Sequence, residues 1–99
     1  MAIAYFHEWP GATPEMAHAV SDRISAQTGG GRPEGGIYHA EGQSDSGWWS
    51  FDVWESEDAA RRFFDEMLKP AAEAVGAPQA QRRILPLHWH SLEAPTAAG

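Results

Sequence analysis

The sequence of 99 residues contains no cysteine. This absence excludes disulfide scaffolds, thiolate metal sites and cysteine nucleophiles. It also fits a reducing compartment, so we expect a cytoplasmic protein. No apolar run approaches the ~20 residues that a membrane-spanning helix needs. The first residues, Met1 to Tyr5, lack the basic and apolar regions of a secretory signal and are interpreted as the start of a strand. We therefore expect no membrane partner.

Positive charge is also scarce. Seven Lys and Arg residues stand against 14 Asp and Glu residues, which gives a formal net charge of −7. The basic residues are scattered, whereas a surface that follows nucleic-acid phosphates needs a clustered excess of positive charge. We therefore expect no nucleic-acid partner and no attraction to anionic membrane surfaces.

Tryptophan, by contrast, is abundant, and three of the five tryptophans lie between Gly47 and Ser56. This segment has the composition of an aromatic strand, in which successive side chains point to opposite faces. Both faces therefore carry large apolar groups: Trp48 and Trp54 on one face, and Trp49, Phe51 and Val53 on the other. Helices on one face of a sheet leave the other face uncovered, so the pattern predicts that a second subunit covers it in a homodimer.

Two helices are indicated by capping residues and apolar stripes. Thr13 before Pro14 and Ser56 before two acidic residues are favourable N-caps. The first helix is expected to end near Thr28, and Pro70 is expected to interrupt or restart the second. The buried stripes are expected to be Met16, Val20 and Ile24 in the first helix, and Ala60, Phe63, Phe64, Met67, Leu68 and Ala71 in the second.

The remaining segments complete a regular order of elements. Three further strands are expected at 3–9, 37–43 and 82–90, and residues 29–36 are interpreted as a glycine-rich loop or lid. The resulting order, strand–helix–strand–strand–helix–strand, predicts a ferredoxin-like α+β fold with one antiparallel sheet and two helices on one face. The chain is expected to form a single domain over 1–90, followed by a disordered tail over 91–99.

Several motifs of this sequence resemble the dimeric α+β-barrel superfamily. That superfamily includes antibiotic-biosynthesis-type monooxygenases, haem-degrading monooxygenases and many short uncharacterised proteins. The resemblance spans 3–90 and is most specific at Ile37-Tyr38-His39-Ala40-Glu41-Gly42, Gly47-Trp48, Asp52-Val53-Trp54-Glu55-Ser56 and the Phe63-Phe64 helix that ends near Leu68 and Pro70. It implies the ferredoxin-like dimeric fold. It also implies one of several activities, because the superfamily contains oxygenases, isomerases, decarboxylases and cyclases.

Histidines are the strongest candidates for proton-transfer chemistry, since their pKa lies near neutrality. His39 lies in mid-strand beside a small alanine and is the candidate general base. His7, or Tyr5 on the same strand face, is a candidate donor. The alternative for His39 is a structural histidine that is hydrogen-bonded to a neighbour, and this alternative remains open.

Asp52 shares a strand face with Trp48 and Trp54, and a buried carboxylate there must be paired or functional. We include it among the candidate catalytic residues, although a structural role as a hydrogen-bond acceptor is the simpler expectation. Aromatic side chains can provide flat walls for a planar ligand, or they can serve only in packing. The candidate wall residues are Trp9, Trp48, Trp54, Phe64 and Trp89.

A metal site is the minority alternative. His88 and His90 would share one face of the last strand. His7 on the neighbouring first strand, or a carboxylate, would complete a set of ligands for zinc, copper or iron. The main expectation is that no cofactor is needed, because the sequence has no nicotinamide, flavin or nucleotide motif.

These observations support three hypotheses. The first is an enzyme that acts on a hydrophobic, aromatic or polyketide-like small molecule through a histidine base, as a cofactor-independent monooxygenase or as an isomerase or cyclase. The second is a haem- or metal-binding protein of the same fold. The third is a non-catalytic ligand-binding or assembly protein.

Overall fold

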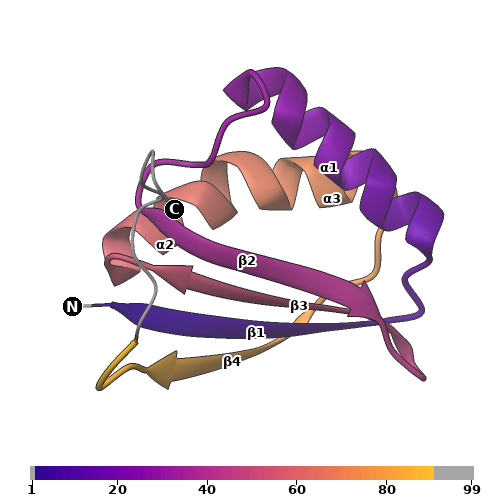
Figure 1. The fold of residues 1–99 in the computed structure, drawn as a ribbon. Coiled ribbons are helices and arrows are strands. Elements are labelled where there is room, and N and C mark those ends of the chain that lie inside the picture. The colour runs from indigo at the N-terminus through magenta and orange to yellow at the C-terminus, as the bar shows by residue number, and fades with distance from the viewer. Residues whose placement is uncertain (1, 91–99) are drawn as a thin grey trace, which may run out of the picture.

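A computed structural model describes residues 2–90 of the chain. The elements follow one another in the expected order (Figure 1): β1 (Ile3–Pro10), α1 (Pro14–Thr28), β2 (Gly36–Gln43), β3 (Gly47–Trp54), α2 (Glu57–Phe63), the π-helical turn η1 (Phe64–Leu68), α3 (Lys69–Ala74) and β4 (Gln81–Pro86).

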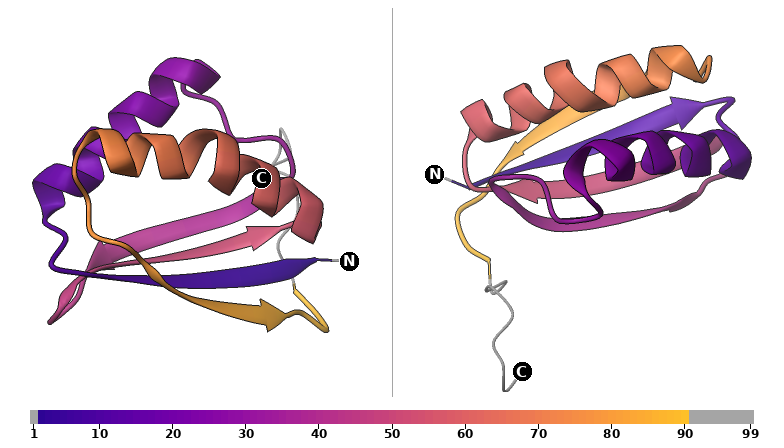
Figure 2. Two further views of the ribbon diagram at one scale, coloured as in Figure 1. Left: turned by 180° about the vertical axis from the view of Figure 1, so that it is seen from behind. Right: turned by 90° about the horizontal axis from the view of Figure 1, so that it is seen from above.

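The four strands form one antiparallel sheet in the order β2-β3-β1-β4. All helices lie on the same face of this sheet, with α1 in one row and α2, η1 and α3 in a second (Figure 2). This arrangement confirms the predicted α+β ferredoxin-like fold. None of the helices within residues 2–90 is both long and apolar enough to cross a membrane.

Helix α1 begins and ends at the expected residues. The Thr13 side chain accepts a hydrogen bond from the backbone N–H of Met16, and Gly29 adopts a left-handed conformation after the last turn. The predicted burial of its apolar stripe is wrong, however, because α1 contains no fully buried residue. The stripe is half-buried since it faces a cavity and not a packed core.

The second helical row is continuous but changes its winding before Pro70. Ser56 caps α2 through its side chain, and the π-helical turn η1 lies between α2 and α3. Proline cannot donate a backbone hydrogen bond and its ring collides with the carbonyl four residues earlier. The wider π-helical turn therefore accommodates Pro70, and the helix is interrupted near this residue as predicted. The central core cluster of this layer consists of Tyr5, Trp54, Ala60 and Phe64.

Strand β4 is shorter than predicted and ends at Pro86 instead of His90. Its last residue pairs with Ile3, the first residue of β1, so the neighbouring strand offers no partner beyond this point. His88 and His90 therefore lie after the strand and do not share a strand face. The predicted disordered tail, 91–99, lies outside the described residues.

The sheet face opposite the helices is aromatic, as the strand pattern predicted. Phe6 and Trp49 stack with ring centroids 6.4 Å apart, and Tyr38 meets Phe51 edge-to-face at 6.3 Å. Tyr38 is 43% exposed. Within residues 2–90 no helix covers this face.

Gly47 is required by a close approach between the β2–β3 turn and the end of β1. A Cβ atom at this position would lie 2.3 Å from the Trp9 carbonyl oxygen and 2.7 Å from the Gly11 nitrogen, both of which are backbone atoms. We expect Gly47→Ala to lower the free energy of unfolding by about 2 kcal/mol or more. Urea unfolding followed by tryptophan fluorescence measures this change.

Gly31→Ala is the matched control. The added Cβ would meet only the Thr28 carbonyl oxygen, at an ordinary 3.8 Å, and the backbone at Gly31 is not left-handed. Its unfolding free energy should stay within about 0.5 kcal/mol of the wild type. Equal effects of the two substitutions would contradict the steric explanation.

Candidate functional site

A cavity of about 510 Å³ lies between α1 and the helix-facing side of the sheet. Its volume is in the range of small-molecule sites. Three tryptophans of the sheet and the apolar stripe of α1 provide large apolar surfaces of its wall: Trp9, Trp48, Trp54, Met16, Val20 and Ile24. The predicted alternation of the aromatic strand thus directs Trp48 and Trp54 toward the cavity.

Four charged side chains also line this cavity: Arg32 in the glycine-rich loop, His39 and Glu41 on β2, and Asp52 on β3. Antiparallel pairing places His39 directly opposite Asp52. Glu41 follows two residues later on β2 and therefore shares the strand face of His39. Three of the four charges thus come together on the sheet wall.

His39 is hydrogen-bonded to both carboxylates. Its Nδ1 bonds the Asp52 carboxylate, and its Nε2 lies 2.5 Å from Glu41 Oε2. Asp52 is only 6% exposed, so the expectation that a buried carboxylate here must be paired is met. The His39 side chain is thus both hydrogen-bonded to its neighbours and part of the cavity lining, so it combines features of the two alternative interpretations.

The two carboxylates raise the pKa of His39 from 6.5 to about 10, first through the hydrogen bond to Asp52 and then through that to Glu41. At neutral pH His39 is therefore an imidazolium ion, with both N–H groups directed at carboxylates. A protonated histidine cannot accept a proton. This environment favours a charged hydrogen-bond donor at position 39 over the expected general base.

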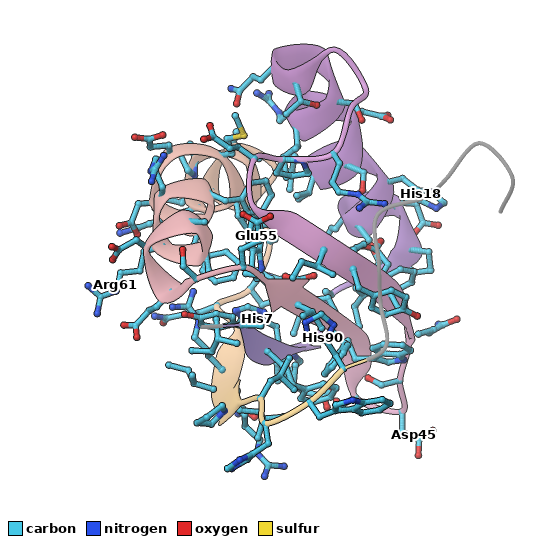
Figure 3. The ribbon with its side chains drawn as sticks, turned by 60° about the vertical axis from the view of Figure 1, so that its left-hand side comes forward. His7, His18, Asp45, Glu55, Arg61 and His90 are labelled. Carbon is cyan, nitrogen blue, oxygen red and sulfur yellow. The ribbon has the colours of Figure 1, made fainter. Side chains whose placement is uncertain are left out.

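His7 has the opposite environment. It is 1% exposed on β1, between the sheet and the helices (Figure 3), and burial together with the Arg82 cation lowers its pKa to about 4. The Nε–H of Arg82 donates to His7 Nε2 at 2.9 Å. His7 is therefore neutral at pH 7 and accepts this bond, while its Nδ1 has no partner among residues 2–90.

Tyr5 and Phe64 belong to the core and do not line the cavity. Their rings meet edge-to-face with centroids 4.9 Å apart, and burial raises the Tyr5 pKa. Phe63, one position earlier, lines the cavity instead of Phe64. Trp89 is 78% exposed and is also outside the cavity wall. His18 projects from α1 into solvent (Figure 3).

The residues expected for a metal site are not arranged as such a site. His7 contacts Arg82, and His88 and His90 lie beyond the end of β4. Over residues 2–90, no group of three or more histidine, aspartate or glutamate side chains is placed to hold a metal ion.

Glu41, Arg32 and Arg82 were not among the predicted site residues. The pattern of β2 contains the signal for Glu41, because a residue two positions from His39 must share its face. The positions of Arg32 and Arg82 depend on the path of a loop and on the pairing of β4 with β1. Such contacts have no counterpart in local sequence.

The raised pKa of His39 can be tested by removing its principal cause. Asp52→Asn keeps the shape of the side chain but removes the charge, so we expect the His39 pKa to fall by about one to three units. Histidine side-chain NMR over a pH series measures it directly. Asp45→Asn is the control, since Asp45 is an exposed carboxylate at the tip of the β2–β3 turn (Figure 3).

The same shift affects stability. Folding raises the His39 pKa, so protonated His39 contributes to the free energy of unfolding. This stabilising contribution is fully present below pH 6.5 and is lost as the pH rises through about 10. Between these values the unfolding free energy should decline less steeply in Asp52→Asn than in the wild type. An unchanged His39 pKa in Asp52→Asn would contradict the assignment.

No protein-family model matches the sequence, and no curated protein matches it either. Solved structures do match. SnoaB, a cofactor-independent oxygenase from Streptomyces nogalater, superposes with a TM-score of 0.66 at 17% identity, over 90% of this chain and 95% of that chain. A dimeric ferredoxin-like protein of unknown function from Thermobifida fusca gives 0.62 at 16% identity, over 88% and 92%.

A third match is a monooxygenase from the gene ActVA-Orf6 of Streptomyces coelicolor, solved with the ligand nanaomycin D. Its TM-score is 0.60 at 17% identity, over 94% of this chain and 92% of that chain. TM-scores of 0.60 to 0.66 show a common fold, whereas identities of 16–17% leave the activity open. This chain therefore shares the ferredoxin-like fold of these proteins, as the sequence motifs predicted.

Proposed function

We propose that this protein is a small-molecule enzyme that binds a hydrophobic, aromatic or polyketide-like ligand in the cavity between α1 and the sheet. It acts as a cofactor-independent monooxygenase, or as an isomerase or cyclase. The observation that carries the proposal is the His39–Asp52 pair on the wall of an otherwise largely apolar cavity of about 510 Å³.

The shape and lining of the cavity favour a planar ligand. Trp9, Trp48 and Trp54 present large flat surfaces, while α1 contributes flexible or branched apolar side chains on the opposite wall. Pockets of this kind bind a ligand mainly by apolar contact and orient it with a few polar groups. The nanaomycin D complex of a neighbour with the same fold is consistent with this class of ligand.

The proposed chemistry begins with an anion. A protonated His39, whose side chain is 55% exposed in the absence of a ligand, offers an N–H group to an enolate or phenolate oxygen. The apolar cavity walls strengthen that interaction once the ligand has excluded water. Once stabilised, the anion can transfer an electron to oxygen or rearrange to an isomer or ring-closed product. Neither route calls for a nicotinamide or flavin. Asp52 is a positioning residue here, because it holds the other nitrogen of the ring.

The active form is proposed to be a homodimer in which two aromatic sheet faces pack together. The helix-free face carries Phe6, Trp49, Phe51 and the exposed ring of Tyr38, which makes it a large apolar surface for so small a domain. A neighbour with the same fold is dimeric.

An assay with 1,8-dihydroxyanthrone, a planar phenol with an acidic C–H group, distinguishes the proposed reactions. Oxygen uptake above the uncatalysed rate supports the monooxygenase. Deuterium exchange at the acidic carbon without oxygen uptake supports the isomerase or cyclase. We expect His39→Gln to reduce either rate by about 10²-fold or more, since it removes the charged donor. If the wild type shows neither oxygen uptake nor deuterium exchange, the result contradicts the proposed enzyme and favours a non-catalytic binding protein.

The dimer is tested by placing a charge on the helix-free face. Phe51→Glu should convert the dimer to a monomer, because a carboxylate buried between two sheets would lack a partner. Native mass spectrometry gives the oligomeric state. Gln27→Glu on the exposed side of α1 is the control and should remain dimeric. A wild-type monomer, or a dimeric Phe51→Glu, would contradict this assembly.

A further inference from the structure

The two carboxylates that bind His39 have different environments. Asp52 is on the adjacent strand, directly opposite His39, and its side chain is 8% exposed. Glu41 is on the same strand as His39, and its longer side chain is 29% exposed. Asp52 is therefore fixed within the sheet, whereas Glu41 can rotate away without breaking any other ion pair or hydrogen bond that the described residues form with it.

We propose that the Glu41 carboxylate binds His39 Nε2–H only while the cavity is empty. When a phenolate or enolate binds, its oxygen displaces Glu41 from this N–H group. This inference rests on the proposed function and identifies the ligand class more narrowly, as a planar molecule with an acidic phenol or enol. Glu41 is then the residue that determines specificity, because only an anionic oxygen can replace a carboxylate at a charged donor without loss.

The charges around the site support such an exchange. Replacing one carboxylate by one oxyanion leaves the net charge at His39 unchanged, so no unpaired charge is created in the cavity. The α1 wall opposite contributes Met16, Ala17, Val20, Ser21, Ile24 and Ser25, none of which is ionisable. Arg32 is the other cation on the lining, and Asp52 remains bound to Nδ1.

The proton balance is simple. When the ligand enters as a neutral phenol or enol, its O–H bond breaks and the proton passes to the departing Glu41 carboxylate, where a new O–H bond forms. His39 keeps both of its protons and bonds the resulting oxyanion through Nε2–H. Glu41 thus both vacates the donor and accepts the proton, while the charge of His39 is constant throughout.

Two probes of nearly equal shape test the proposal. 4-Nitro-1-naphthol is an acidic phenol whose anion absorbs visible light, and 1-methoxy-4-nitronaphthalene lacks the ionisable proton. Both are titrated at pH 8, below the His39 pKa of about 10, into the wild type, Glu41→Gln, His39→Gln and the control Glu34→Gln. Glu34 is exposed and does not line the cavity.

We expect Glu41→Gln to bind the naphtholate about two- to fivefold more tightly than the wild type, because the competing carboxylate is gone. His39→Gln should bind it more weakly, with loss of the absorption shift of the bound anion. The methoxy probe should bind all four proteins equally. The exchange is refuted if Glu41→Gln fails to tighten naphtholate binding or tightens both probes alike, although the proposed cavity function then still stands. If neither probe binds the wild type, the proposed function itself fails.

Discussion

The antiparallel pairing of β2 with β3 is the constraint on which the site depends. It sets His39 opposite Asp52 and, two residues further, directs Glu41 to the same face. A shift of β2 by one residue in this register would turn His39 and Glu41 toward the aromatic face and leave Asp52 without its histidine partner. The β2–β3 turn, in which Ser44 and Gly47 exchange two backbone hydrogen bonds, fixes this register.

The two histidines on the helix-facing side of the sheet show how position determines chemistry. His39 lies between two carboxylates and carries a proton at neutral pH, whereas His7 lies beside an arginine in the core and remains neutral. Their side chains are chemically identical. The proposed chemistry uses only His39, which faces the cavity. His7 instead packs in the core against Phe64, whose ring also contacts Arg82.

Much of the fold could be predicted from the sequence, because its signals are local. The caps at Thr13 and Ser56 and the alternation along β3 predict elements and faces correctly. The end of β4 could not be predicted, since it depends on the register in which β4 pairs with β1. For the site, the pairing of His39 with Asp52 required the strand register, and its protonation followed only from the two contacts together. A histidine in isolation suggests a base, but the same residue between two carboxylates is a charged hydrogen-bond donor.

Helix α1 contains no buried residue, and its apolar stripe borders a cavity. Side chains that border a void lose dispersion contacts and apolar burial. Packing therefore stabilises α1 less than it stabilises the α2–α3 row. A ligand that fills the space would supply the missing half of those contacts. The apolar stripe of α1 would then serve both to bind the ligand and to stabilise the fold, because the ligand would pack where a hydrophobic core is absent.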